Sequence, residues 1–304
     1  MKKITFKDLQ KSFNTEKKCI NYILENKYKD GTCPICKTKT NFYKVKSLKY
    51  HFDTKCKHRF SILADTPLKG IKTQLTTVFH IIFLLSIAKN GLSAKEVQRH
   101  FGLTYKAAWA LLNKIRQTLA NKELLSGDIE MDEAFFGGLE SNKHKDKKNI
   151  NEKGNTKISS NKSTLIGLKS RFNGNVVINA EKNRKKVTIN KNIENSIEDL
   201  NVLITDEWKA YKSVAIENNL PHLVIEHKYE WYGKKMFDNQ TGEIININTN
   251  GIEGMWSIVK NSLRNTYKRP SGKFLQSYLD EFSFRFNNRK SDVFIKMLKR
   301  SFAI

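Results

Sequence analysis

Apolar segments of strand length alternate with helical segments over residues 127–300. Strand candidates cover residues 128–136, 163–171, 175–180, 201–206 and 223–227, and helical segments are expected at 186–199, 251–264 and 273–288. Strands interleaved with helices predict an α/β domain, here over residues 127–304, in which helices flank a mixed sheet. Residues 141–162 are crowded with Lys and Asn, and we expect them to form a mobile loop.

Three acidic residues occupy special places in this pattern. Asp132 lies within the first strand candidate, Asp206 ends a later one, and Glu253 lies near the start of a helical segment. Each also has an ordinary explanation. Asp132 could belong to a turn, with Glu133 beside it as the functional acid, Asp206 could cap a helix, and Glu253 could favour the positive end of its helix. Taken together, the three positions predict a shared carboxylate site.

Carboxylates on rigid elements suit Mg²⁺ or Mn²⁺, and two such ions can promote attack on a phosphodiester. One acid inside a strand, one at the end of its neighbour and one on a covering helix is the RNase H-like arrangement. Asp132, Asp206 and Glu253 are therefore the expected ligands of two ions. Lys260 follows Glu253 by two helical turns, so it is expected on the same face, where it could hold a DNA phosphate.

A cysteine cluster predicts a small zinc-ribbon-like domain over residues 31–62. Cys33 and Cys36 have the spacing of one zinc knuckle, and Cys56 follows at the distance of a second. The fourth ligand is open. The expected zinc set is Cys33, Cys36 and Cys56 together with Asp53, His58 or, alternatively, His51. A ribbon that has lost its metal and folds by aromatic packing remains the alternative.

Residues 1–30 read as a helical lead-in, and residues 63–126 as a helical region that includes a helix-turn-helix over 92–120. Ser93 and Glu96 form a capping-box pattern, Gly102 marks the turn, and Thr104 can cap the second helix. A plain helical hairpin would look similar. If the pair binds DNA, the second helix would enter the major groove. The predicted DNA contacts are Thr104, Lys106, Lys114 and Arg116.

The charge balance favours a nucleic-acid partner. The chain has 55 Lys and Arg against 30 Asp and Glu, a net charge of +25, and a large positive excess attracts polyanions. A codon bias toward Lys and Asn could contribute to the same excess. The sequence has no apolar run of membrane-spanning length and no signal-peptide pattern at its start, so we expect a cytoplasmic protein without a membrane partner.

Four segments carry a resemblance to a known family. They are MDEAFFGG (131–138), ITDEWKAY (204–211), INTNGIEGMWSIVKNSLRNTY (247–267) and YLDEFSFRFNNR (278–289). In this order they resemble the insertion sequence 1595 family of transposases, which have a zinc ribbon ahead of a DDE-type catalytic domain. The resemblance spans roughly residues 20–290.

The resemblance implies that Asp132 and Asp206 are the two catalytic aspartates. It leaves Glu253 or Asn250 as the third ligand, and we favour Glu253 with Asn250 as an accessory. Asp53 stands at an expected ribbon cysteine, and Asn248 at an expected histidine. His227 matches a histidine of the family pattern that could contact the cleaved DNA or be a buried structural residue.

The expected function is therefore metal-dependent cleavage at the terminal inverted repeats of a bacterial insertion sequence. Transfer of the freed 3′-hydroxyl ends into double-stranded target DNA would follow. Two DNA ends must be held together, which predicts a homodimer or larger assembly on DNA. The alternatives are a domesticated DNA-binding regulator with an inactive catalytic domain and a plain metal-dependent nuclease.

Overall fold

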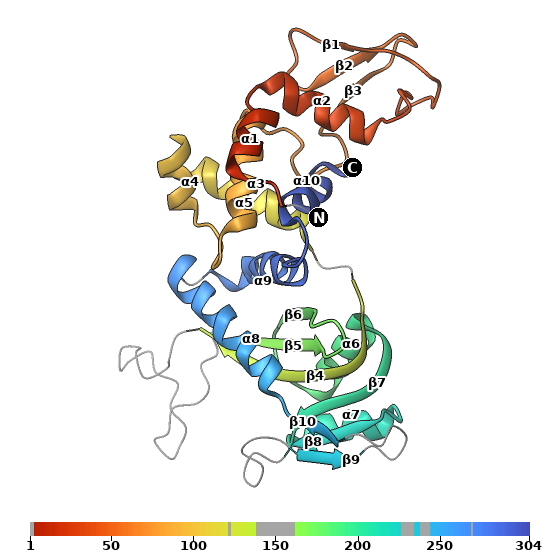
Figure 1. Ribbon diagram of the computed structural model, residues 1–304, viewed down its shortest axis with the longest axis vertical. Helices are drawn as coiled ribbons and strands as arrows, with labels where there is room; N and C mark the ends of the chain where they lie inside the picture. The colour runs from red at the N-terminus through yellow and green to blue at the C-terminus, as the bar shows by residue number, and fades with distance from the viewer. Residues whose placement is uncertain (1–2, 121–122, 138–161, 226–233, 238–243, 269) are drawn as a thin grey trace. The chain divides into compact units, whose positions relative to one another are not determined.

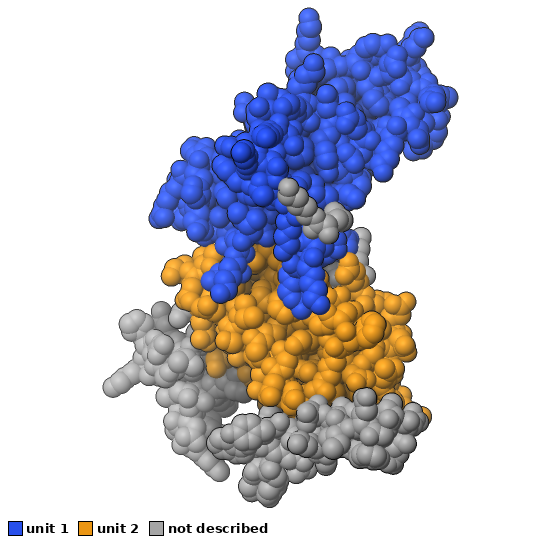
Figure 2. Space-filling view, viewed as in Figure 1, with its two compact units in different colours: residues 1–120, 288–304 blue, residues 121–287 orange. Residues whose placement is uncertain are grey.

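The computed structural model of the chain describes residues 3–120, 123–137, 162–225, 234–237, 244–268 and 270–304 (Figure 1). These residues form two compact units (Figure 2): unit 1 comprises 1–120 and 288–304, and unit 2 comprises 121–287. Among the described helices, none combines the length and apolar character that crossing a membrane requires.

Unit 1 begins with two helices and a small antiparallel sheet. Helices α1 (Phe6–Ser12) and α2 (Glu16–Lys27) confirm the helical lead-in, and strands β1 (Phe42–Lys44), β2 (His51–Thr54) and β3 (Arg59–Ser61) pair in sequence order. The aromatic rings of Phe42, Phe60 and Tyr28 contact one another edge to face across this sheet and α2. The ribbon therefore has its own apolar packing beside the cysteines.

Three helices follow, α3 (Leu75–Ile87), α4 (Ala94–Phe101) and α5 (Tyr105–Thr118). The predicted local caps are confirmed: Ser93 and Glu96 form a capping box on α4, and the Thr104 hydroxyl accepts from the first turn of α5. Gly102 ends α4 in the left-handed conformation, as the turn requires. Helix α3 ends with Ala88 as its C-cap residue.

The N-terminus of α3 is capped from another helix. The Glu16 carboxylate on α2 accepts hydrogen bonds from the backbone N–H groups of Leu75 and Thr76 at 3.0 and 3.1 Å, and from the Tyr50 hydroxyl at 2.7 Å. The N-cap residue of α3, Gln74, makes no side-chain cap. A distant carboxylate therefore satisfies backbone donors that the local sequence leaves open.

The last helix, α10 (Val293–Phe302), falls within the residues 127–304 that the sequence assigns to the α/β domain. It belongs to unit 1 instead, because its aromatic side chains pack on α3. Phe302 contacts Phe79, and Phe294 contacts Phe83, with ring centroids 5.3 and 5.5 Å apart. Asp292 caps α10 and accepts the backbone N–H of Ile4, so both ends of the chain lie in one unit.

Unit 2 is built on one five-stranded sheet of order β6-β5-β4-β7-β8. Strands β4 (Leu125–Phe136), β5 (Ser163–Ser170) and β6 (Val176–Glu181) pair antiparallel, while β7 (Ile197–Asp206) and β8 (His222–Ile225) extend the sheet in parallel with β4. The predicted mixed sheet is confirmed. A separate hairpin, β9 (Lys234–Phe237) with β10 (Ile244–Ile247), lies in the Gly- and Asn-rich region.

Helices cover both faces of the sheet (Figure 1). Helices α8 (Asn250–Asn261) and α9 (Gly272–Asn287) share one apolar cluster with Ala134 and Phe136 of β4. Helices α6 (Lys186–Ser196) and α7 (Lys209–Glu217) share another with Ile129 and Met131. Even-numbered residues of β4 thus face α8 and α9, and odd-numbered ones face α6 and α7. A π-helical turn at Ser262–Thr266 follows α8.

The free edge of strand β6 is covered by two amide side chains of α9. Gln276 accepts from the backbone N–H of Ala180 and donates to the carbonyl of Ile178, at 2.7 and 3.0 Å. Asn287 likewise accepts from the N–H and donates to the carbonyl of Val176, at 2.8 and 3.0 Å. These amides take the hydrogen bonds that a further strand would otherwise make.

Candidate active site and metal cluster

The register of the central parallel strands brings Asp132 and Asp206 to neighbouring positions. The last paired residues of β4 and β7, up to Glu130 and Ile204, are offset by 74 residues. Asp132 and Asp206 are also 74 residues apart. They therefore continue the same register two residues further on, where adjacent strands are about 4.8 Å apart. Residues at matching positions of parallel strands point to the same face.

That face is the one covered by α8. Glu133, the next residue of β4, points to the opposite face, where its carboxylate accepts from Arg184 at 2.6 Å and from the Tyr211 hydroxyl at 2.5 Å. The pleat of the strand therefore places Asp132, and not Glu133, on the face that Asp206 shares. Asp132 is the acid that lies beside Asp206, while Glu133 ties the sheet to α7.

The surroundings of Asp132 disfavour its charge in the absence of a cation. Burial raises the pKa of Asp132 to about 6, and the negative charges of Glu133 and Asp206 act in the same direction. A backbone hydrogen bond at Glu133 and the Trp256 indole lower it in part. A pair of carboxylates whose charges repel each other is the electrostatic environment that a bound cation would relieve.

Glu253 lies on α8, exposed, in the first turn of the helix. It precedes Trp256 by three residues, and the indole N–H of Trp256 donates to Asp132 at 2.9 Å. Lys260 lies two turns further along, as predicted, and is partly exposed. Asn250 is the first residue of the helix and is also exposed, with its backbone N–H bonded to the Asn248 side chain.

The three acids share one feature: a neutral donor holds one oxygen of each. Asp132 accepts from the Trp256 indole at 2.9 Å, Asp206 from the backbone N–H of Trp208 at 3.1 Å, and Glu253 from the Thr249 hydroxyl at 2.8 Å. In the part of the chain that the structure describes, none of the three forms an ion pair with a basic side chain.

The three carboxylates do not converge on a single point. Among the described residues, only the cysteine cluster treated below brings at least three ligand atoms within 4.8 Å of one another. A site for two ions about 3.5–4 Å apart is wider than a single-ion site, since its outer ligands bind different ions. The donor set of two adjacent aspartates with a glutamate on the covering helix is compatible with that wider arrangement.

A buried glutamate fixes the start of α8 to the sheet. Glu130 of β4, 4% exposed, accepts from the backbone N–H of Ile252 at 2.8 Å and from Arg171 at 2.9 Å. Arg171 also donates to the carbonyl of Asn248 at 2.5 Å. A Cβ added at Gly251 would lie 2.7 Å from the Glu130 carboxylate. Helix α8, which carries Glu253, thus begins two strand positions from Asp132.

Sequence reasoning missed Trp256, Gly167, Glu130 and Arg171 as parts of this site. Trp256 lies within a segment quoted for the family resemblance, and its spacing from Glu253 places it one helical turn away. Gly167 interrupts the apolar run at residues 165–168 of β5, and a glycine inside a strand is a known signal of a close approach by another group. The sequence carries no comparable signal for Glu130 and Arg171, because their pairing depends on the sheet register.

The cysteine cluster forms a compact set of four ligand atoms. Those of Cys33, Cys36, Cys56 and His58 all lie within 4.8 Å of one another. The Cys36 and Cys56 sulfurs are 3.4 Å apart, and the His58 Nδ1 lies 3.5 and 3.6 Å from the Cys33 and Cys56 sulfurs. Tetrahedral zinc with sulfur and nitrogen ligands separates them by about 3.5–3.8 Å, so the set fits that ion.

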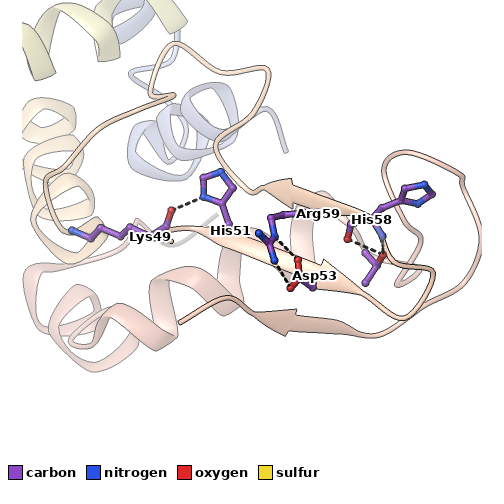
Figure 3. Close-up of polar contacts among 6 residues, drawn as sticks. Lys49, His51, Asp53, His58 and Arg59 are labelled. Atoms are coloured by element: carbon purple, nitrogen blue, oxygen red, sulfur yellow. Dashed lines mark hydrogen bonds and ion pairs between the residues drawn. The ribbon is translucent and has the colours of Figure 1, made fainter. Parts of the chain in front are cut away.

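The Asp53 alternative is not supported by the geometry. Figure 3 shows Asp53 paired with Arg59 across strands β2 and β3, at 2.6 and 3.0 Å. His51 binds the backbone carbonyl of Lys49 and is not part of the cluster. Of the three candidates for the fourth ligand, His58 is the one that lies with the three cysteines in this cluster. Its selection depends on a turn at Thr54–His58 that replaces the expected second Cys-x-x-Cys knuckle.

Hydrogen bonds around the cluster favour thiolate at Cys56. The Thr54 hydroxyl is the largest influence, and with Cys36 and His58 it lowers the pKa of Cys56 to about 5. The pKa of Cys36 is also lowered, chiefly by Thr38. Metal binding requires deprotonated cysteine, so this environment assists it.

The four predicted DNA contacts differ in exposure. Thr104 and Lys106 are exposed at the start of α5, where Tyr105 is 48% exposed between them. Lys114 donates to the backbone carbonyls of Pro67 and Lys69, at 2.8 and 2.9 Å. The prediction for Arg116 is wrong: its side chain is 1% exposed and donates to the carbonyl of Leu92. Helical spacing places it on the buried side of α5.

Two further expectations fall on residues outside the described part of the chain. These are the contact assigned to His227 and most of the loop expected at 141–162.

Comparison with known proteins identifies the domain around the carboxylates. The profile of the ISXO2-like transposase domain of insertion sequence 1595 matches residues 124–287, more than half of the chain. No curated protein matches. Similar solved structures include a simian T-cell lymphotropic virus intasome in complex with PP2A regulatory subunit B56 gamma (12% identity, 66% of this chain covered) and the Drosophila P element transposase strand transfer complex (9% identity, 80% covered). Both have a TM-score of 0.30.

The chain spans 64% of the length of each of those two chains. The family profile covers β4 to α9, and hence every strand and helix that carries the three acids. The chain therefore belongs to the family of ISXO2-like transposases.

Proposed function

We propose that this chain is a DDE-type DNA transposase, a metal-dependent polynucleotidyl transferase that acts on the ends of a bacterial insertion sequence. The observation that carries the proposal is the shared register of Asp132 and Asp206 on adjacent parallel strands. With Glu253 on the covering helix, these acids would hold two Mg²⁺ or Mn²⁺ ions. Carboxylate oxygens are the ligands that both ions prefer.

The charge environment supports a divalent cation at this place. Asp132 and Asp206 lie together without a basic partner among the described residues, and burial raises the pKa of Asp132. When bound, two ions would activate an attacking oxygen and stabilise the leaving oxygen of an in-line displacement. The protein's own task is to hold the acids in a fixed arrangement and to orient the DNA.

Helical geometry supports Glu253 over Asn250 as the third ligand. At about 100° per residue, Glu253 lies about 60° around the helix from Trp256, which touches Asp132, whereas Asn250 lies about 120° away. Glu253 also carries a charge. Thr249 holds one of its oxygens and leaves the other available. Asn250 remains an accessory ligand in this proposal.

The proposed reaction has two displacements. Water attacks a phosphodiester at the element end, and the bond to the 3′ oxygen breaks to release a free 3′-hydroxyl. That hydroxyl then attacks a phosphodiester of the target DNA and displaces a second 3′-hydroxyl. One phosphodiester replaces another in the joining step, so no external energy source is needed. Lys260, two turns past Glu253, would hold a phosphate near the acids.

Double-stranded DNA, as element ends and as target, is the proposed partner, and a homodimer or larger assembly is the proposed form on DNA. The helix pair α4–α5 would bind it, with Thr104 and Lys106 exposed at the start of α5. The net charge of +25 supports strong binding to the phosphate backbone of DNA, and this binding should weaken as the salt concentration rises. For the ribbon we propose one structural zinc ion held by Cys33, Cys36, Cys56 and His58.

The test is an assay with purified protein, DNA fragments that carry the element ends, a supercoiled target plasmid and Mg²⁺ or Mn²⁺. We expect cleaved ends and joined products. Asp132→Asn and Asp206→Asn should yield neither product while binding the DNA normally. A matched control is Glu217→Gln on α7, an exposed acid that pairs with Lys186 on the far face of the sheet.

The products distinguish the alternatives. Cleavage without joining would make the protein a nuclease, and binding without either product would make it a regulator. Activity that persists in Asp132→Asn would contradict the proposed site.

A further inference from the structure

We propose that Trp256 is a positioning residue for Asp132: its indole N–H holds one carboxylate oxygen and leaves the other for a divalent cation. The inference rests on the proposed function, in which Asp132 binds that cation. It adds a role for a residue of α8 that is not itself a ligand. Gly167 of β5 is part of the same arrangement, because it provides the space that the indole occupies.

The contact joins two elements. The Trp256 Nε1 lies 2.9 Å from the Asp132 Oδ2, and the Trp256 side chain is 4% exposed. The donors to the other two acids are local: Trp208 follows Asp206 by two residues, and Thr249 precedes Glu253 by four. Only the Asp132 carboxylate, among these three, is oriented from a different element. Its orientation therefore depends on how α8 packs on the sheet.

The sheet is shaped to admit this indole. Gly167 lies directly opposite Asp132 in the β4–β5 register. A Cβ added at Gly167 would lie 2.7 and 2.9 Å from the Cζ2 and Cη2 atoms of Trp256, closer than carbon atoms can approach. Glycine weakens a strand interior, so its presence here among buried apolar residues requires a reason. The reason is the passage of the ring to Asp132.

The donor has the chemistry that a ligand-orienting group needs. An indole N–H donates only and carries no charge, so it fixes the carboxylate without neutralising it. A lysine or arginine at the same place would compete with the cation for that charge. Partners that orient a metal ligand from behind typically contribute 10- to 100-fold in metal affinity or activity.

A purely structural role for Trp256 predicts a different outcome. The ring also packs in the apolar cluster between the sheet and α8–α9, with Met255 and Leu165. Trp256→Phe keeps much of that packing and removes only the donor. Gly167→Ala keeps the donor and displaces the ring. If the hydrogen bond matters, both variants should weaken cation binding. If only the packing matters, both variants should lower the stability of the protein and leave cation binding unchanged.

The matched control is Tyr267→Phe. It removes another partly buried hydrogen bond to a carboxylate in unit 2, from the Tyr267 hydroxyl to Glu281 at 2.6 Å. Glu281 and Tyr267 lie on α9 and the turn before it, and neither contacts the three acids. This variant measures how much stability is lost with such a hydrogen bond when the proposed cation site is left intact.

The experiment is a titration of the full-length protein with Mg²⁺ alone, followed through the indole ¹H–¹⁵N signals of its four tryptophans. The Trp256 signal is assigned as the one missing in Trp256→Phe. We expect Mg²⁺ to shift it in the wild type and in Tyr267→Phe, and to leave it unmoved in Asp132→Asn. In parallel, the Mg²⁺ concentration for half-maximal DNA cleavage should rise about 10- to 100-fold in Trp256→Phe and Gly167→Ala.

Two results would overturn the inference. One is a Trp256 indole signal that does not shift when Mg²⁺ is added to the active wild-type enzyme. The other is an unchanged Mg²⁺ requirement in a folded Trp256→Phe or Gly167→Ala protein. If Trp256→Phe does not fold, the titration of the wild type and the Mg²⁺ requirement of Gly167→Ala still test the inference. Failure of the proposed function has a distinct result, namely full cleavage activity in Asp132→Asn.

Discussion

The backbone N–H of Ile252 in the first turn of α8 donates to the carboxylate of Glu130 on β4, at a distance of 2.8 Å. Thr249, the N-cap residue of this helix, makes no side-chain cap. The cap thus comes from the sheet, 122 residues away along the chain. Glu130 also pairs with Arg171, so one buried carboxylate joins the helix start, strand β4 and the end of β5.

We expect Glu130→Gln to lower the free energy of unfolding of unit 2 by about 1–3 kcal/mol, because Arg171 and the helix start lose their charged acceptor. Urea titration followed by circular dichroism measures this. Glu217→Gln, which breaks an exposed pair with Lys186 in the same unit, is the control and should change stability little. Equal effects of the two substitutions would show that the buried cap stabilises unit 2 no more than the exposed ion pair does.

Metal content should separate the alternatives for the fourth ribbon ligand. Protein purified without chelators is expected to contain about one zinc per chain, and His58→Ala and Cys56→Ser should reduce this strongly. Asp53→Asn and His51→Ala should keep the metal, because these side chains bind Arg59 and the Lys49 carbonyl instead. Elemental analysis measures the ratio. Loss of zinc in Asp53→Asn with retention in His58→Ala would reverse the assignment.

Two basic residues of α5 should behave differently toward DNA. Lys106→Ala is expected to weaken binding of element-end DNA and to lower the slope of log affinity against log salt by about 1, since one exposed cation is lost. Arg116→Ala should chiefly destabilise unit 1, because its buried side chain bonds to Leu92. Fluorescence anisotropy at several salt concentrations, with thermal unfolding alongside, checks both. A salt slope lowered by Arg116→Ala in folded protein would contradict its structural role.

The pH dependence of stability should include a contribution from Asp280 on α9. Burial raises the pKa of Asp280 above its usual 3.8, although a hydrogen bond from Gln276 opposes this. Between 3.8 and the raised value the folded state holds more protons than the unfolded state, so stability falls as pH rises. Asp280→Asn removes this loss and retains an acceptor for Gln276.

The gain in unfolding free energy from Asp280→Asn should therefore be larger at pH 7 than near pH 4. Denaturant titrations at both pH values measure it. A gain that is the same at both pH values, or larger at the lower one, would show that folding does not raise the pKa of the Asp280 carboxyl.

Features set by neighbouring residues were predictable from the sequence. The capping box of Ser93 and Glu96, the turn at Gly102 and the strands that carry Asp132 and Asp206 all follow from local patterns. The relative register of β4 and β7 was not predictable, because a shift by one residue changes which side chains share a face. The structure supplies that register, and with it the distinction between Asp132 and Glu133.

Contacts between distant segments account for what sequence reasoning missed. The helices α3 and α8 receive caps from Glu16 and Glu130, and neither pairing has a signal in the residues next to the helix. The return of α10 to unit 1 is another case, since its apolar residues predict a buried helix without naming its partner. The contact predicted for Arg116 is wrong because helical spacing places this residue on the buried side of α5.

The two amides that α9 places along β6 have a consequence for how copies of this protein can meet. Gln276 and Asn287 occupy backbone groups that would otherwise accept a strand from a second molecule. Polymerisation by continuing the sheet from chain to chain is blocked at this border unless α9 first moves away. The assembly of several copies around two DNA ends that we propose could therefore bring the chains close together without growth into fibres through this border.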